Sequence, residues 1–192
     1  MKGKLIRCGW CLSSFEMILY HDTEWGVPVH NDMKLFEFII LDTFQAGLSW
    51  SIILKKRNAL REAFDNFNPK IILEYKSEKI NQLLKNPLII RNKLKILSVI
   101  NNAKAFLDIK DRFGTFDKFI WRFVDGETIH NKWENLNEIP TKTKQSDLMS
   151  DELKKRGFKF VGSTICYAFM QATGMVNDHL ISCFRYKELC KL

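Results

Sequence analysis

The sequence has no long apolar run, no internal repeat and no alternating pattern. Its apolar stretches all fall short of the roughly 18 residues that a membrane-spanning helix needs. The first residues, MKGKLIRCGWCLSS, are basic, but their apolar part is too short for a signal peptide. We therefore expect a cytoplasmic protein with no membrane partner. No segment alternates with the period of two that indicates a half-buried strand.

The chain has no even set of cysteines, since it contains five. No secretory segment accompanies these cysteines, which argues against a framework of disulfide bonds. The cysteines are therefore expected to bind a metal or to be buried in the core. Four histidines are the other candidate metal ligands.

What the chain does have is enough apolar material for a core. It contains 192 residues, of which 46% are hydrophobic and 12% aromatic, and this excludes a disordered chain. The length suits a core that needs no disulfide staples. We expect one unit over residues 1–192, with a helical core at about 30–175, and a monomer.

The positive charge is concentrated in the middle of the chain. The net charge is +8. Residues 55–113 hold 14 basic and 6 acidic groups, whereas residues 1–54 are net negative and residues 114–192 only slightly positive. A basic block of this kind is typical of a nucleic-acid partner, although lysine-rich solvated helices produce the same composition.

Apolar spacing predicts an all-α fold with about ten helices. Asn31 and Asn68-Pro69 are helix-start signals, and Gly114 is a helix-stop signal. In the helix that begins near Arg91, we expect Leu94 to point inward. A polar connector is expected over 125–143. The predicted helices include 31–44, 49–64, 91–112, 116–123, 146–156, 163–173 and 177–184.

Cysteine and histidine spacing indicates a metal site. His179 and Cys183 lie four residues apart on the helix predicted at 177–184, so both would share one face. Cys8, Cys11 and His21 offer three further ligands near the N-terminus. Zinc in structural sites takes four nitrogen or sulfur ligands. Spacing alone leaves two sets open, since either Cys11 or His21 completes the group with the other three.

Three motifs carry a resemblance to a known family: YHDTEWG at 20–26, QAGLSW at 45–50 and RGFKFVG at 156–162. With weaker matches in order along the chain, they make the sequence similar to the 3-methyladenine DNA glycosylase I family. The resemblance implies a helix-hairpin-helix glycosylase fold and removal of 3-methyladenine from alkylated double-stranded DNA. It also implies one zinc ion that joins the N- and C-terminal segments through Cys8, His21, His179 and Cys183.

The residues suggest how such an enzyme would hold DNA. A base must leave the duplex before it can be hydrolysed. The turn from Arg156 to Gly162, with Gly157 and Lys159, could place backbone amides and charge against a phosphate. Gly47-Leu48 could present an apolar wedge to the gap that the base leaves. Further phosphate candidates are Lys55, Lys56, Arg57, Arg91, Lys93 and Lys95.

The extruded base would be recognised by aromatic side chains and one carboxylate. An N3-methylated adenine is cationic, so it favours an electron-rich aromatic face and a charged hydrogen-bond acceptor. Tyr20 and Trp50 match pocket aromatics of the family, Trp10 and Trp25 lie nearby, and Asp42 matches its pocket carboxylate. The family usually has Glu in place of Asp42 and commonly Tyr in place of Met17.

The resemblance also bears on the reaction. Relatives of the wider fold that cut the DNA strand carry a lysine at about Val161-Gly162, and this chain has none there. We therefore predict a monofunctional enzyme with a water nucleophile, Asp42 as the catalytic group and free 3-methyladenine as the product. Two alternatives are a zinc-stabilised lesion-binding protein without catalysis and a glycosylase for another alkylpurine.

Overall fold

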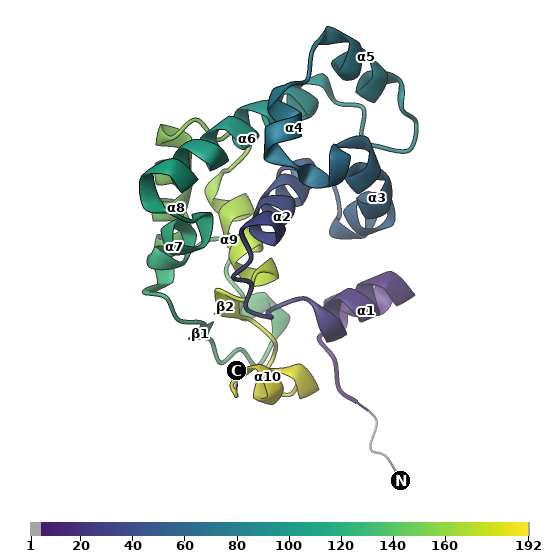
Figure 1. Cartoon of the computed structure of the whole chain (residues 1–192). Helices are drawn as coiled ribbons and strands as arrows, with labels where there is room; N and C mark the ends of the chain where they lie inside the picture. Colours follow the sequence, from purple (N-terminus) through teal and green to yellow (C-terminus); the bar gives the residue numbers. More distant parts are fainter. Residues whose placement is uncertain (1–4, 192) are drawn as a thin grey trace.

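The computed structural model describes residues 5–191, and Figure 1 shows that helices dominate it. This confirms the predicted helical class. A single pair of two-residue parallel strands is present in the described part, with Ile129 opposite Val176 and His130 opposite Asn177. The elements are α1 (Phe15–Thr23), α2 (Asp32–Gln45), α3 (Trp50–Ala63), α4 (Pro69–Leu73), α5 (Ser77–Lys85), α6 (Lys93–Phe113), α7 (Phe116–Trp121), β1 (Ile129–His130), α8 (Lys144–Lys155), α9 (Ser163–Ala172), β2 (Val176–Asn177) and α10 (Phe184–Leu189).

The helix boundaries follow the local signals in the sequence. The Asn31 side chain accepts a hydrogen bond from the Lys34 amide at the start of α2. Asn68 caps α4 in the same way, with Pro69 in its first turn. Gly114 ends α6 in a left-handed conformation that other residues rarely adopt. These three signals were read correctly from the sequence.

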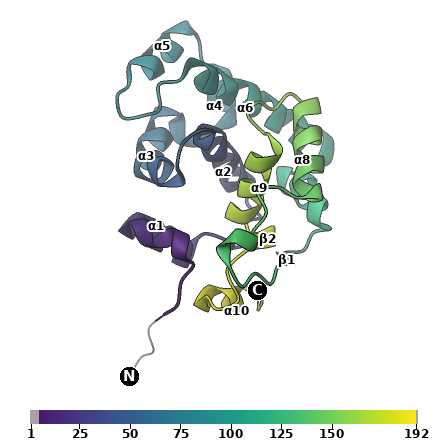
Figure 2. The same cartoon turned by 180° about the vertical axis from the view of Figure 1, so that it is seen from behind.

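Helix α2 lies at the centre of the molecule and packs against α3, α6, α7 and α9. Its residues from Leu35 to Phe44 are almost continuously buried. A helix that is buried all round needs neighbours on every side. Figures 1 and 2 show α2 and α9 near the middle, with α1 and α10 at the lower end. Asp42 therefore lies in the buried part of α2, whereas the turn after Gln45 reaches the surface at residues 47–49.

The two ends of the described chain meet. The Phe184 amide donates to the Ile6 carbonyl over 3.0 Å, and Cys8 and Cys183 belong to the same buried cluster. The connector between α7 and α8 also reaches this end, because the Ile181 amide donates to the Trp133 carbonyl. Residues far apart in sequence thus build one corner of the fold.

The expected helix over 177–184 is wrong. Asn177 belongs to β2, Cys183 is the N-cap of α10, and the residues between form a loop. Backbone groups here bond to β1 and the connector, as the Ile181 amide does, instead of to a helical ladder. Helix α1 was not expected.

At the start of α6, the burial of Leu94 and Lys95 is the opposite of what the apolar pattern predicted. Leu94 is 68% exposed, whereas Lys95 is only 6% exposed. Among the described residues, no helix is both long and apolar enough to cross a membrane.

Candidate active site and metal centre

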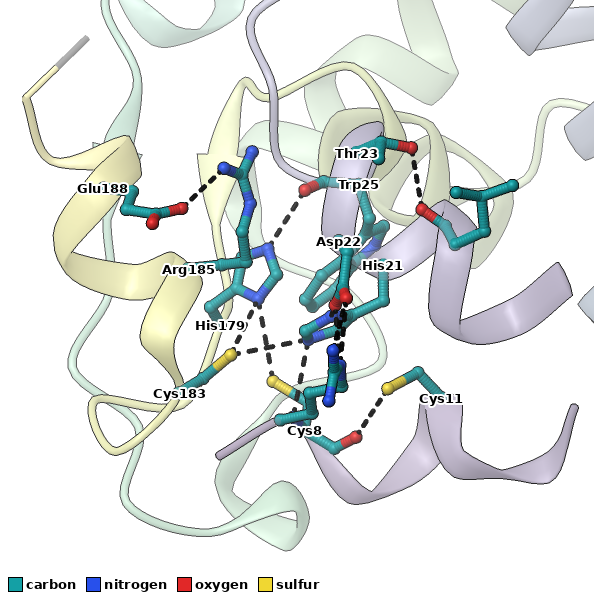
Figure 3. Close-up of polar contacts among 12 residues, drawn as sticks. Cys8, Cys11, His21, Asp22, Thr23, Trp25, His179, Cys183, Arg185 and Glu188 are labelled. Atoms are coloured by element: carbon teal, nitrogen blue, oxygen red, sulfur yellow. Dashed lines mark hydrogen bonds and ion pairs between the residues drawn. The ribbon is translucent and has the colours of Figure 1, made fainter. Parts of the chain in front are cut away.

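Four buried side chains form a compact ligand group where the chain ends meet. Cys8, His21, His179 and Cys183 each offer one ligand atom, and these atoms all lie within 4.8 Å of one another. Cys8 precedes a short 3-10 turn, His21 lies on α1, and the other two come from the loop between β2 and α10. Figure 3 shows the four side chains pointing toward one another.

The spacing of this group suits a tetrahedral metal ion. His179 Nδ1 lies 3.7 Å from Cys8 Sγ and 3.5 Å from Cys183 Sγ, and His21 Nε2 lies 3.5 Å from Cys183 Sγ. A tetrahedral zinc ion with ordinary Zn–S and Zn–N bonds requires an S···N separation of about 3.6 Å. These three separations match such an ion, and all four ligand atoms lie within 4.8 Å of one another.

Neighbouring groups orient both imidazoles toward the centre. His21 Nδ1 lies 2.7 Å from the Asp22 carboxylate, which Arg7 holds through a 2.8 Å ion pair. His179 Nε2 lies 3.0 Å from the Trp25 carbonyl. Since both partners only accept hydrogen bonds, the proton sits on the outer nitrogen and the inner one keeps its lone pair. The hydrogen bond from the Cys8 thiol lowers the pKa of Cys183, which favours the metal-binding thiolate.

Cys11 lies outside the ligand group. Its thiol donates to the Cys8 carbonyl over 3.1 Å, and burial raises its pKa to about 11. The thiol is therefore occupied within the turn that carries Cys8. The structure thus resolves the choice that spacing left open in favour of the set with His21.

A cavity of about 380 Å³ opens next to the metal centre. Ring centroids of Trp10 and Trp25 lie 4.9 Å apart, and those of Tyr20 and Trp50 lie 5.3 Å apart. The cavity thus has aromatic walls, and the five predicted base-contact residues all line it. The lining residues are Trp10, Met17, Tyr20, Trp25, Asp42, Gln45, Trp50, Leu136, Ile139, Pro140, Ala168, Gln171 and Ala172.

Two buried polar atoms on the wall of this cavity lack a partner among the described residues. They are Oδ2 of Asp42 and Nε1 of Trp50. Asp42 is 1% exposed, and burial raises the pKa of its carboxyl well above the ordinary value, although Arg57 opposes this shift. Buried polar groups without partners are rare in folded proteins and require an explanation. A ligand with both a donor and an acceptor would satisfy them.

The metal centre and the cavity share a wall. The Trp25 carbonyl accepts the bond from His179, and the Trp25 ring lines the cavity. The Trp10 ring packs edge-on against His21, with centroids 5.4 Å apart. Two of the candidate metal ligands thus contact two of the aromatic residues that line the cavity.

Sequence reasoning missed the far side of the cavity. Ala168, Gln171 and Ala172 have helical spacing and lie on one face of α9, which was a readable signal. Leu136 and Ile139 come from the connector, where no periodicity exists to read.

Asp178 holds this side together. Its buried carboxylate accepts hydrogen bonds of 2.6–2.8 Å from Asn131, Trp133, Tyr167 and Gln171. Two of these donors come from the connector and two from α9. The carboxylate therefore fixes both sides of the wall relative to each other.

The turn between α2 and α3 presents Leu48 at the surface. Gly47 has φ 77°, a conformation that favours glycine, and the Leu48 amide donates to the Gln45 carbonyl over 2.6 Å. Leu48 is 37% exposed. Leu48 lies in the short turn that connects two residues of the cavity wall, Gln45 and Trp50.

The hairpin between α8 and α9 is clamped to α6. The Asn102 side chain both donates to the Lys159 carbonyl and accepts from the Lys159 amide, over 3.2 and 2.8 Å. Gly162 is the N-cap of α9, so free amides of the first turn follow it. The non-glycine residue Phe160 has a φ of 57°, which marks a strained turn.

Several predicted phosphate contacts are occupied within the protein. Arg156 pairs with Glu152 at 2.7 Å and stacks on Phe113 and Phe119. Arg57 is 7% exposed and pairs with Glu24 and Glu37, so it does not face a ligand at the surface. Lys56 donates to the Leu88 carbonyl, whereas Lys55, Arg91, Lys93 and Lys159 are exposed.

The family model for methyladenine glycosylases matches residues 10–186. The chain belongs to this family. The methyladenine glycosylase described here is 47% identical to DNA-3-methyladenine glycosylase 1 of Escherichia coli K12 over 180 residues, which cover 94% of this chain and 96% of the relative. The family and the fold inferred from the three motifs are thereby confirmed.

Solved structures of related proteins agree with this assignment. A crystal structure of 3-methyladenine DNA glycosylase I superposes on this methyladenine glycosylase with a TM-score of 0.91 and 48% identity, covering 93% of this chain and 98% of the other. Another, a variant in complex with 3-methyladenine, gives a TM-score of 0.90 at 31% identity over 93% and 96% of the two chains.

Proposed function

We propose that the protein is a monofunctional DNA glycosylase that hydrolyses the N-glycosidic bond of 3-methyladenine in alkylated double-stranded DNA. The observation that carries this proposal is the aromatic cavity in which Asp42 Oδ2 and Trp50 Nε1 have no protein partner. Membership of the methyladenine glycosylase family supports the choice of base.

The cavity favours a cationic purine over a neutral one. Aromatic faces of Tyr20, Trp10 and Trp25 attract a positively charged ring. Burial raises the pKa of the Asp42 carboxyl, because an ionised carboxylate in the buried cavity wall loses its hydration. A cationic base beside it lowers that pKa again, so the ionised carboxylate forms where the charge is present and makes a charge-assisted hydrogen bond. Neutral adenine provides no such compensation.

The same groups account for the reaction. A cationic base is already a good leaving group, so it requires no strong general acid to protonate it. In this proposal Asp42 is the catalytic residue, since its carboxylate contacts the flipped base and stabilises positive charge that develops at the sugar. Water attacks the sugar carbon, the bond to the cationic base breaks with its electron pair passing to the base, and neutral 3-methyladenine leaves while the proton of the water is released to solvent. No lysine stands at Val161-Gly162 to form a covalent adduct.

DNA would be held by the surface features beside the cavity. Amides that follow Gly162 at the start of α9, with Gly157 and Lys159 in the hairpin, suit a phosphate. Leu48 suits the gap that the flipped base leaves in the duplex. Arg156 would contribute through the shape of the hairpin, because its guanidinium pairs with Glu152.

We propose that the ion at Cys8, His21, His179 and Cys183 is zinc, one per chain. Two thiolates and two imidazoles at tetrahedral spacing are a zinc-type donor set. When bound, the ion supplies a cross-link between the two ends of the chain. With four protein ligands the site is a structural one, and the residues themselves orient Trp25 and Trp10 at the cavity.

The test is to incubate methylated duplex DNA with the purified protein and separate the released bases by chromatography. Free 3-methyladenine should appear in proportion to enzyme and time. Tight binding of the methylated duplex with no base above background would overturn the enzymatic proposal in favour of a lesion-binding protein. Release of another alkylpurine alone would overturn the proposed specificity.

A further inference from the structure

Lys95 is a buried cation that the proposed reaction does not use. It lies in the first turn of α6 and is 6% exposed, although its neighbour Leu94 is 68% exposed. In the described part of the chain, no carboxylate forms an ion pair with it. Burying an ammonium group without an anion lowers the stability of the fold, and burial lowers the pKa of Lys95. This loss of stability indicates that the buried Lys95 ammonium has a specific role.

The ammonium is bound to the end of α2. Its Nζ donates to the Phe44 carbonyl over 2.8 Å and to the Ala46 carbonyl over 2.5 Å. Carbonyls at a helix C-terminus lack helical partners and carry the negative end of the helix dipole, which a cation stabilises. Lys95 therefore fixes the last turn of α2 to the first turn of α6.

The contact lies directly before the turn that presents Leu48. Ala46 is the C-cap of α2, and Gly47 follows with nothing within 4 Å of a Cβ built on it. Lys95 holds the turn on its N-terminal side through two carbonyls, and the 2.6 Å bond from the Leu48 amide to Gln45 closes it.

We propose that Lys95 is a positioning residue that holds the Ala46–Ser49 turn rigid so that Leu48 can enter the DNA stack. This rests on the proposed role of Leu48 as a wedge. A side chain that separates stacked bases must resist the force that they exert on it, and a turn anchored on one side by a buried ammonium does so better than a free glycine turn. The cation acts through Leu48 and makes no contact with the DNA itself.

A double-mutant cycle tests this with Leu48→Ala and Lys95→Met, which keeps the length of the side chain and removes its donors. The probe is a duplex that contains a tetrahydrofuran abasic-site analogue, whose affinity is measured by fluorescence anisotropy. Each single variant should weaken binding by about tenfold. The double variant should be no weaker than either, because both remove the same function.

Two controls separate positioning from general damage. Lys104→Met removes an exposed positive charge from the same helix and should stay within about twofold of the wild type, which accounts for loss of charge alone. Binding of free 3-methyladenine, followed by tryptophan fluorescence, should be unchanged in Lys95→Met, since the cavity walls are intact. If Lys95→Met does not fold, Lys95→Gln, which keeps one N–H donor group, takes its place in the cycle.

Three results would overturn the inference: an unchanged affinity in Lys95→Met, effects that multiply in the double variant, or an equal loss in Lys104→Met. An unaffected Leu48→Ala would overturn the wedge and the Lys95 inference together. Continued release of 3-methyladenine by that variant would leave the proposed enzymatic activity standing.

Discussion

Replacing Cys183 by alanine removes one ligand from the metal centre and weakens the link between the two ends of the chain. Cys183 lies between His21 and His179, at 3.5 Å from a ring nitrogen of each. Three ligands remain, and we expect the variant to be purified with less than one metal ion per chain. The main consequence should be a loss of stability.

The size of this loss follows from the length of chain that the centre closes. In the proposed metal centre the ion joins His21 to His179, so the closed loop comprises about 158 residues, for which the chain-entropy estimate is about 5 kcal/mol. In a protein of this length, 1 kcal/mol corresponds to about 2–4 °C in Tm. The melting temperature should therefore fall by about 10–20 °C if the cross-link is lost entirely.

Elemental analysis of freshly purified protein and scanning calorimetry check both parts of this prediction. Cys11→Ala is the matched control, because Cys11 is also a buried thiol near Cys8 but lies outside the ligand group. It should keep one metal ion. A Cys183→Ala protein with a full complement of metal and a Tm within about 2 °C of the wild type would refute the reasoning.

Four further predictions concern the cavity and the hairpin. Burial raises the pKa of Asp42, so ionisation of this carboxyl opposes folding once the pH rises above the ordinary carboxyl pKa. Asp42→Asn should therefore gain more stability at about pH 7 than at about pH 4. Calorimetry at both pH values checks this, and equal gains would contradict it. The same variant should excise 3-methyladenine about 10- to 100-fold more slowly, whereas Asp42→Glu should keep or improve the rate, and unchanged rates for both would exclude a role for this carboxyl. Trp50→Phe should lower the affinity for free 3-methyladenine about tenfold without loss of Tm, because its indole N–H has no protein partner to lose; calorimetric titration that shows the opposite pattern would disprove the assignment. Asn102→Ala should lower the free energy of unfolding by about 1–3 kcal/mol and weaken duplex binding in an anisotropy assay, because both hydrogen bonds to the Lys159 backbone are lost. Unchanged DNA affinity would show that DNA binding does not require this contact between the hairpin and α6.

The sequence was most informative where local chemistry determines structure. Asn31 and Gly114 mark helix boundaries because caps act over a few residues. The aromatic side of the cavity was also predictable, since Tyr20 and Trp50 belong to motifs that the family resemblance identified. Periodicity failed at Leu94 and Lys95, because the hydrogen bonds of Lys95 to α2 override the apolar pattern.

Long-range contacts account for what the sequence could not predict. The spacing of His179 and Cys183 resembled a helix, but the loop between them is held by the distant connector at Trp133. The connector wall at Leu136 and Ile139 depends on bonds to Asp178, some 40 residues further along the chain. No pattern within a short window contains such information.

The dispersed origin of the site has a consequence for protein synthesis. The aromatic wall is made first, the connector wall much later, and the candidate metal ligands His179 and Cys183 after both. Until His179 has been added, the nascent chain carries an incomplete cavity in which the Trp25 carbonyl lacks its hydrogen bond from His179. The cavity and the ligand group are therefore complete only once Cys183 has been added, and a product that ends before Cys183 lacks one of the four candidate metal ligands.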